Sequence, residues 1–228
     1  MNIRALIFDV DGTLAETEEA HREAFNRTFA AWGLSWHWDV DDYRQLLKTA
    51  GGKERIRAFQ DTLHLSDRRL DETEIARLHV EKTARYGAIL AKGDLPLRPG
   101  VADLIETARA RGLRLAVATT TSRPNVDALC RCCWGRPAAA VFDVIAAGDE
   151  VAAMKPAPDV YLLALDRLAL PASACLAFED SANGLRSATA AGIATVIAPS
   201  AHTRTEDFSG ASAIVPDLGA PQVAALLA

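Results

Sequence analysis

Short, unbroken apolar runs that end abruptly in polar residues recur along the chain, and they predict buried parallel strands. The predicted strands are 5–8, 113–118, 142–147, 176–178 and 195–198. Between them, apolar positions repeat at a spacing of three to four residues, which predicts helices. These helices are 101–111, 124–133, 158–168 and a segment that ends at Ala191. Alternating strands and helices form βαβ units, so we predict an α/β fold, a Rossmann-like parallel sheet with helices on both faces.

The stretch between the first two strands has a purely helical pattern. It starts at Glu16, and further helical patterns cover 41–49, 53–63 and 72–90 with no convincing strand between them. A segment punctuated by proline and glycine, 93–100, follows as a candidate hinge. We therefore predict two domains. The core comprises residues 1–15 and 95–228, and a small α-helical cap domain is inserted as residues 16–94.

Polar side chains with chemical potential stand where the predicted strands end. They are Asp9 and Asp11, Thr119, Lys155, and Glu179 with Asp180. The carboxyl ends of parallel strands share one edge of a sheet, and open α/β sheets bind ligands there. Each signal alone has an ordinary structural alternative, such as a turn, a helix cap or a solvated lysine. Their ordered recurrence at successive strand ends favours a single site.

This set of residues suits phosphoryl transfer, which needs a nucleophile, a proton donor for the leaving oxygen, and cations beside the phosphate. Asp9 would attack and form an aspartyl-phosphate, while Asp11 would act as general acid and then as general base. Thr119 would hold a phosphate oxygen, and Lys155 would offset the repulsion among the acids. Carboxylates directly after a buried strand also predict Mg²⁺. Its expected ligands are Asp9, Asp180, the backbone carbonyl of Asp11, and Glu179 directly or at one remove.

Composition narrows the class of protein. The 228 residues are 50% hydrophobic and carry a net charge of −5. A chain of this length can bury one large core plus a small satellite domain. No apolar run approaches the ~20 residues that span a bilayer, no charged-then-apolar leader precedes the first strand, and the acidic balance disfavours nucleic acid. We expect a cytoplasmic monomer with no membrane or nucleic-acid partner.

Four cysteines include a C-x-x-C pair, Cys130 and Cys133. Because no second Cys/His pair at zinc spacing accompanies them, we interpret them as thiols buried in a helix and not as a metal or redox site.

The motif Asp9-Val10-Asp11-Gly12-Thr13, with Thr119, Lys155 and Glu179-Asp180, resembles the motifs of the haloacid dehalogenase-like superfamily. The resemblance covers essentially the whole chain. It implies that Asp9 is the nucleophile, that Mg²⁺ is the cofactor, and that the helical insert is a cap that closes over the active site.

Gly51-Gly52-Lys53-Glu54-Arg55 is the informative part of the insert. Two glycines opening a helix offer free N–H groups and a positive dipole end beside two basic side chains, which suits an anion. An ordinary loop before a helix with solvated charges explains the residues equally well.

Together with the runs 9–18 and 119–126, this segment looks like the CbbY-type phosphatases of autotrophs. That resemblance implies hydrolysis of xylulose 1,5-bisphosphate, an inhibitor of Rubisco, the carboxylase of the Calvin cycle. It implies that Lys53, Arg55 and Arg123 grip the second phosphate. The other expected substrate-binding residues are Glu16, His21, Tyr43 and Thr120. His37, His64, His79 and His202 match no motif, and we expect them to be structural.

Several alternatives use the same residues differently. A sugar-phosphate mutase of the β-phosphoglucomutase type needs the same nucleophile and acid, and a phosphatase of another sugar phosphate differs only in its cap. A haloacid dehalogenase would use Asp9 on carbon but needs neither Asp11 nor a metal. A dinucleotide-binding protein would want G-x-G-x-x-G in the first turn, which is absent. A non-catalytic binding module would not require a nucleophile, an acid, a lysine and metal-binding acids together, so this class is disfavoured.

Overall fold

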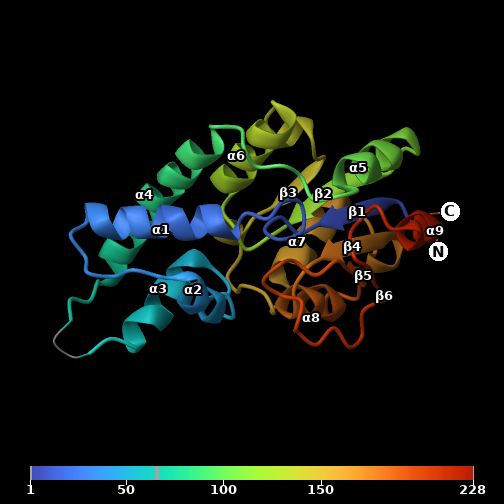
Figure 1. Cartoon of the computed structure of the whole chain (residues 1–228). Helices are drawn as coiled ribbons and strands as arrows, with labels where there is room; N and C mark the ends of the chain where they lie inside the picture. The colour runs from blue at the N-terminus through green and yellow to red at the C-terminus, as the bar shows by residue number, and fades with distance from the viewer. Residues whose placement is uncertain (1, 65–66, 228) are drawn as a thin grey trace.

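A computed structural model describes residues 2–64 and 67–227 (Figure 1). The strands are β1 (Ala5–Phe8), β2 (Arg114–Ala118), β3 (Val144–Ala146), β4 (Cys175–Glu179), β5 (Ala194–Ile197) and β6 (Ala213–Ile214). The helices are α1 (Glu18–Ala31), α2 (Val40–Leu46), α3 (Gly52–Asp61), α4 (Glu72–Leu90), α5 (Val101–Ala110), α6 (Arg123–Trp134), α7 (Asp159–Leu168), α8 (Ala182–Ala190) and α9 (Pro221–Leu227). Three single 3-10 turns occur at Ala138–Ala140, Gly148–Glu150 and Ala172–Ala174.

The six strands form one parallel sheet in the order β3-β2-β1-β4-β5-β6. Strand β1 is central, and Phe8 at its end pairs with Val117 of β2 and with Phe178 of β4. This register brings the carboxyl ends of β1, β2 and β4 to one edge of the sheet. The predicted fold class is therefore confirmed.

The sheet is covered on both faces, as its nearly continuous apolar strands require. On one face, Leu6 and Phe8 belong to a core with α5, α6 and α9. On the other face, Ala5 and Ile7 pack in a core with α7 and α8. The residues of β1 thus alternate between the two cores. A strand buried on both sides holds its terminal carboxylate in a fixed position.

Helices α1 to α4 lie beside the carboxyl edge of the sheet (Figure 1) and are called the helical insert below. Helices α1 and α4 pack along each other. The insert has its own apolar core of aromatic and aliphatic side chains, and Trp38, Phe25 and Phe29 are fully buried in it. Ring centroids of Phe29 and Trp38 lie 4.8 Å apart in an edge-on contact, an arrangement that aromatic pairs favour.

The two chain segments that join the helical insert to the sheet meet at one point. The N–H of Arg98, in the segment that returns to the sheet, donates to the carbonyl of Leu14 in the outgoing segment, at 2.8 Å. The division into domains at residues 16 and 94 stays a prediction. The predicted domain ends at 1 and 228 and residues 65–66 of the predicted cap lie outside the described part of the chain.

Strand β6 and helix α9 were not predicted. Strand β6 has two residues, too few to show an alternation. Helix α9 has seven residues, as many as α2, so its length does not explain why it was not predicted. Among the described residues, no helix is both long and apolar enough to cross a bilayer.

Candidate active site

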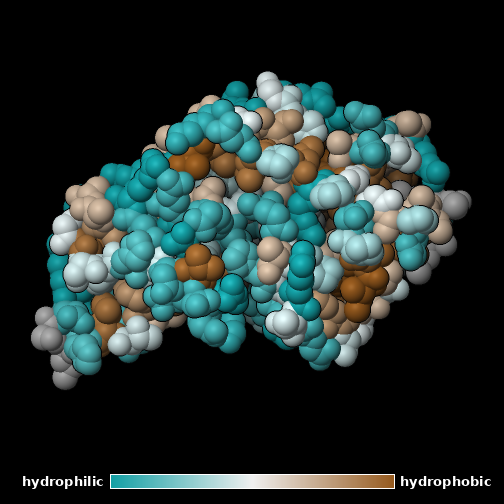
Figure 2. Space-filling model, in the orientation of Figure 1, coloured by the Kyte–Doolittle hydropathy of each residue, from teal (hydrophilic) through white to brown (hydrophobic). Residues whose placement is uncertain are grey.

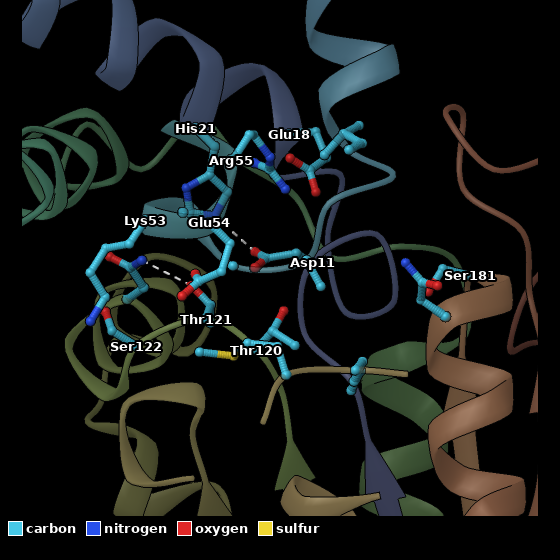
Figure 3. Close-up of a pocket in the computed structure, with 18 of the residues that line it drawn as sticks. Asp11, Glu18, His21, Lys53, Glu54, Arg55, Thr120, Thr121, Ser122 and Ser181 are labelled. Carbon is cyan, nitrogen blue, oxygen red and sulfur yellow. Dashed lines mark hydrogen bonds and ion pairs between the residues drawn. The ribbon is translucent and has the colours of Figure 1, made fainter. Parts of the chain in front are cut away.

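A cavity of about 600 Å³ lies between the helical insert and the carboxyl edge of the sheet. The molecular surface is notched between α2 and α8 (Figure 2), and residues from both sides of the notch line the cavity. Figure 3 shows His21 and Arg55 of the insert on one side of Asp11, with Thr120 and Thr121 of the sheet domain on the other. The sequence-predicted residues in its lining are Asp9, Asp11, His21, Lys53, Arg55, Thr120, Lys155 and Asp180.

Asp9 follows β1 directly and is 6% exposed. Its Oδ1 accepts a hydrogen bond from Lys155 Nζ at 2.7 Å. Burial raises the pKa of Asp9 to about 7, although the Lys155 ammonium acts in the opposite direction. Lys155 Nζ also donates to Glu179 Oε1 at 2.6 Å and to the Ala118 carbonyl at 2.9 Å. Its three donors are therefore used, and the ammonium is fixed between two acids.

Glu179 is the last residue of β4 and is fully buried. Its Oε1 accepts from Lys155 and from the Tyr161 hydroxyl, the latter at 2.7 Å, whereas Oε2 has no hydrogen-bond partner. Gly184, in the first turn of α8, lies against this carboxylate, and a Cβ there would collide with it. Glu179 thus orients Lys155 and leaves one carboxylate oxygen uncompensated.

Asp180 lies between the loop that contains Gly12 and the loop that contains Thr203. The carboxylate lies so close to Gly12 that a Cβ on that glycine would collide with Oδ2. Thr203 Oγ1 donates to the Asp180 backbone carbonyl at 2.7 Å. Burial raises the pKa of Asp180 well above its ordinary value, and the nearby Asp9 and Glu179 carboxylates raise it further.

Asp9, Glu179 and Asp180 offer carboxylate oxygens that all lie within 4.8 Å of one another. Lys155 supplies a single positive charge to these three buried acids. The excess negative charge, the unpartnered Glu179 Oε2 and the all-oxygen donor set fit a hard divalent cation.

Asp11 is held by two residues at the start of the helical insert, Thr17 just before α1 and His21 within it. Its Oδ1 accepts from Thr17 Oγ1 at 2.6 Å and lies 3.0 Å from His21 Nε2. Burial by itself would raise the pKa of Asp11, but the interactions with His21 and Thr17 prevail and lower it to about 2. The carboxylate is thus ionised and held by Thr17 and His21.

His21 is in turn supported by Lys82 of α4, whose Nζ lies 2.5 Å from His21 Nδ1. The ring of His21 stacks on Tyr86 at 4.0 Å between centroids. Burial lowers the pKa of Lys82 to about 7 and that of His21 below its usual value. A Lys82 N–H that donates to Nδ1 leaves the Nε2 proton of His21 facing Asp11, which fixes the tautomer.

Thr119 follows β2 and is 1% exposed; its Oγ1 accepts from the N–H of Thr121 at 3.2 Å. Its side chain is not part of the cavity lining, whereas Thr120, Thr121 and Ser122 are. Ser122 occupies the N-cap position of α6, but its side chain makes no capping hydrogen bond. The turn therefore presents backbone and side-chain donors to the cavity.

Lys53 and Arg55 lie in the first turns of α3 and line the cavity opposite Asp9. Arg55 Nη1 donates to the Tyr43 hydroxyl at 2.8 Å, and the guanidinium lies 5.0 Å from the Tyr43 ring centroid. Tyr43 itself is 1% exposed and donates to Glu18 Oε2 at 3.0 Å. Tyr43 thus lies behind Arg55 and outside the cavity lining.

Two other predicted substrate residues lie outside the cavity. Glu16 pairs with Arg98 at 3.4 Å, and Glu18 lines the cavity in its place. Helix α1 begins only at Glu18, so the preceding turn directs Glu16 to the linkers. The backbone N–H of Arg123 donates to Asp149 at 3.3 Å, and this residue starts α6 outside the lining.

Sequence reasoning missed several lining residues. His79 and His202, expected to be structural, line the cavity, as do Glu18, Lys82 and Ser200. Burial lowers the pKa of His79 to about 3, and the Lys82, Lys53 and Arg55 charges lower it further. The sequence contained one signal: His79 and Lys82, spaced at i and i+3, share one face of α4.

The cysteines lie away from this site. All four are free thiols, and burial raises the pKa of both Cys130 and Cys133 to about 12. A thiol that holds its proton is a poor nucleophile and metal ligand. Cys130 is buried, as predicted, whereas Cys133 is only half-buried.

The comparisons with known proteins agree with one another. A family model described as haloacid dehalogenase-like hydrolase matches residues 3–192. Protein CbbY of Rhodobacter capsulatus is 58% identical over 226 residues, covering 99% of this chain and 98% of that protein. A crystal structure of CbbY from Rhodobacter sphaeroides in complex with phosphate has a TM-score of 0.91 at 54% identity, over 95% of each chain. A mutant of that protein in complex with xylulose-(1,5)bisphosphate also has a TM-score of 0.91, at 53% identity over 95% of each chain.

Proposed function

This chain belongs to the haloacid dehalogenase-like hydrolases and is a sugar-phosphate phosphatase; from that premise we propose that its substrate is xylulose 1,5-bisphosphate. The observation that carries the proposal is the placement of Lys53 and Arg55 across one cavity from Asp9 and Lys155. A bisphosphate has two anionic ends. One would meet Asp9 and the other the N-terminal end of α3, where free N–H groups and two cations favour an anion.

The proposed reaction at the sheet edge starts with Asp9. Its carboxylate attacks phosphorus, the bond from phosphorus to the sugar oxygen breaks, and that oxygen takes a proton from Asp11. Water then attacks the aspartyl-phosphate, Asp11 takes a proton from this water, and phosphate leaves with Asp9 restored. Lys155 holds Asp9 at 2.7 Å throughout and offsets the charge that accumulates.

Asp11 must be protonated before it can serve as the acid, and the residues behind it offer a route. Lys82 would give a proton to His21 Nδ1 while His21 Nε2 gives its own to Asp11, across the observed 2.5 Å and 3.0 Å separations. With a pKa of about 7 for Lys82 and about 2 for Asp11, this transfer is uphill in the free protein; the negative charge of a phosphorylated substrate beside Asp11 would raise the pKa of its carboxyl and favour it.

We further propose Mg²⁺ as the cofactor, held by Asp9, Asp180 and the Asp11 carbonyl, with Glu179 either a ligand through its unpartnered Oε2 or acting through Lys155. When bound, the ion would neutralise phosphate oxygens and orient the phosphoryl group. The cytoplasmic location and the monomeric state remain predictions from the sequence.

The test is phosphate release with Mg²⁺ from xylulose 1,5-bisphosphate, ribulose 1,5-bisphosphate, β-glucose 1-phosphate and simple sugar monophosphates. We expect a strong preference for the xylulose compound. Release from monophosphates alone would contradict the second anion site, and an isomerised sugar phosphate without free phosphate would identify a mutase.

A pair of variants on α3 separates the anion site from general helix effects. Lys53→Met removes a cation that lines the cavity. Arg57→Met removes one that lies outside the lining and pairs with Glu72 at 2.6 Å and with Glu54 at 3.1 Å. We expect Lys53→Met to raise the KM for the bisphosphate by about tenfold, as loss of one charged hydrogen bond would. Arg57→Met should leave it unchanged. An equal effect of both variants would remove the support for phosphate binding by α3.

A further inference from the structure

Arg98 lies in the segment that returns from the helical insert to the sheet, and its side chain is 9% exposed. Its guanidinium donates to three backbone carbonyls, those of Gly12, Ala198 and Pro199, the last two at 2.8 Å. Gly12 follows Asp11, whereas Ala198 and Pro199 follow β5. One side chain therefore ties together two loops that are far apart in the sequence.

These two loops form the walls around Asp180. On one wall, Gly12 contacts the Asp180 carboxylate, and its Cβ position also lies 3.1 Å from the Ser200 Cβ. On the other wall, Ser200 and Thr203 follow Pro199, and Thr203 Oγ1 binds the Asp180 carbonyl. The distance between the walls fixes where the carboxylate can lie. Arg98 holds one carbonyl of the first wall and two that precede the second.

We propose that Arg98 is a positioning residue that sets the spacing of these two loops and thereby places Asp180 and Asp11 for the phosphatase reaction. A planar guanidinium offers donors in a fixed fork, so three carbonyls bound to it are held at fixed relative positions. A lysine has the same charge but no such fork. The function of Arg98 is thus geometric and depends on the shape of its head group.

The ion pair with Glu16 does not account for this arrangement. Glu16 is 42% exposed in its side chain, lies 3.4 Å from Arg98 Nε and also accepts from the N–H of Ala201 at 3.3 Å. Exposed pairs of this kind contribute little. The carbonyl contacts are shielded from water, where a hydrogen bond to a charged donor matters more. Removal of Glu16 should therefore have a much smaller effect than removal of Arg98.

The kinetic test compares Arg98→Met and Arg98→Lys with one control, Arg109→Met. Arg109 also donates to a backbone carbonyl, that of Val141, but on a segment outside the cavity lining. We expect both Arg98 variants to lower kcat by about tenfold to a hundredfold, the size of effect that a small misplacement of reacting groups produces. The KM for the bisphosphate should stay within about twofold, because the N-terminal end of α3 is untouched. The Arg109→Met control should retain kcat.

The kinetic comparison rests on the proposed function, so a second measurement uses the metal-free protein without substrate. Amide hydrogen exchange should become faster at 11–14 and 198–203 in both Arg98 variants and stay unchanged in Arg109→Met. Added guanidinium ion should restore protection and kcat in Arg98→Met only. Arg98→Lys keeps the charge and serves if the methionine variant fails to fold.

The outcomes distinguish a failure of the proposed function from a failure of the proposed role of Arg98. If the parent protein releases no phosphate from any sugar phosphate, the proposed function fails, and the exchange data still decide the role of Arg98. If exchange at 198–203 and kcat are both unchanged in Arg98→Lys and Arg98→Met, Arg98 is not a positioning residue. Equal losses in Arg109→Met would also overturn the proposal, because they would show a general stability effect.

Discussion

Asp9 and Asp11 lie two residues apart, yet their environments shift their pKa values in opposite directions. Burial raises the pKa of Asp9 to about 7 despite the hydrogen bond from Lys155. For Asp11, burial acts in the same direction, but His21 and Thr17 outweigh it and lower the pKa to about 2. Divergent values on neighbouring acids are typical of residues with different catalytic roles.

Removal of the nucleophilic carboxylate should abolish turnover without unfolding the protein. Asp9→Asn keeps the shape of the side chain but cannot form an acyl phosphate, so we expect kcat to fall by at least about a thousandfold. The control is Asp143→Asn, because Asp143 Oδ2 accepts from the Leu115 N–H and asparagine retains an acceptor. Phosphate release and far-UV circular dichroism measure both. Substantial turnover by Asp9→Asn would refute the mechanism.

Lys82 should lower stability in a way that depends on pH. Its pKa is about 7 in the folded protein against 10.5 for an ordinary lysine. Below pH 7 the amine is charged in both states, so the full burial cost is present; the cost declines as pH rises from 7 towards 10.5. Lys82→Met should therefore raise the free energy of unfolding at pH 6 by about 1–3 kcal/mol, and this gain should shrink at higher pH.

Urea unfolding at several pH values measures this effect, with Lys92→Met, an exposed lysine just beyond α4, as the control. The same Lys82 variant should lose activity, because His21 loses the partner of Nδ1. A gain that grows with pH would contradict the assignment of Lys82 as a buried, destabilising amine.

The strand-end residues were predictable from the sequence because a strand end is a local feature. Asp9 and Asp180 directly follow β1 and β4, and the structure brings them together. Lys155, expected at a strand end, lies instead in the loop between β3 and α7 and reaches Asp9 from there. The choice between Glu16 and Glu18 was not predictable in this way, because it depends on the residue at which α1 begins. Tyr43 illustrates the same limit, since its burial follows from the packing of α2 on α3.

At the scale of elements, two glycines in helices should respond oppositely to the same substitution. A Cβ at Gly184 in α8 would collide with the Glu179 carboxylate, whereas one at Gly87 in α4 would meet only the Ala128 Cβ, at 4.0 Å. Gly184→Ala should destabilise the protein by about 2–4 kcal/mol and displace Lys155 through Glu179. Gly87→Ala should stabilise it by about 0.5–1 kcal/mol, the helix-propensity difference.

Thermal and urea unfolding of both glycine variants, with kcat for each, provides the measurement. Gly87→Ala should leave kcat unchanged. If Gly184→Ala changed neither the free energy of unfolding nor kcat, the Glu179 carboxylate would have to adopt another rotamer without loss of its contacts.

The existence of most elements was predictable, whereas the bounds of several short ones were not. Helix α4 matches its predicted range of 72–90 because nineteen residues repeat the periodicity many times. Strand β3 was predicted as 142–147 but spans only Val144–Ala146, because an apolar run extends beyond the residues that pair. The order of strands in the sheet required the pairing itself.

At the scale of the whole molecule, the apolar core of the insert and the sheet core that contains Leu6 and Phe8 should unfold together. Helices α1 and α4 each contribute to both: Ala24 and Tyr86 belong to the core of the sheet, and Phe25 and Leu78 to that of the insert. Three of the four tryptophans, 32, 36 and 38, lie in the insert. In Trp134→Phe, fluorescence therefore reports on the insert alone, and its urea midpoint should coincide with that from circular dichroism. Two separate midpoints would show independent folding units.

The meeting of Leu14 and Arg98 has a consequence for how such a protein can change. The outgoing and returning segments are hydrogen-bonded neighbours at the point where the insert begins and ends. A different helical unit whose ends lie equally close could replace the insert without stretching the sheet. The strand-end acids would keep their chemistry while the new unit recognised another molecule. In such a fold, the insert that determines substrate selectivity can change in evolution while the catalytic residues of the sheet stay the same.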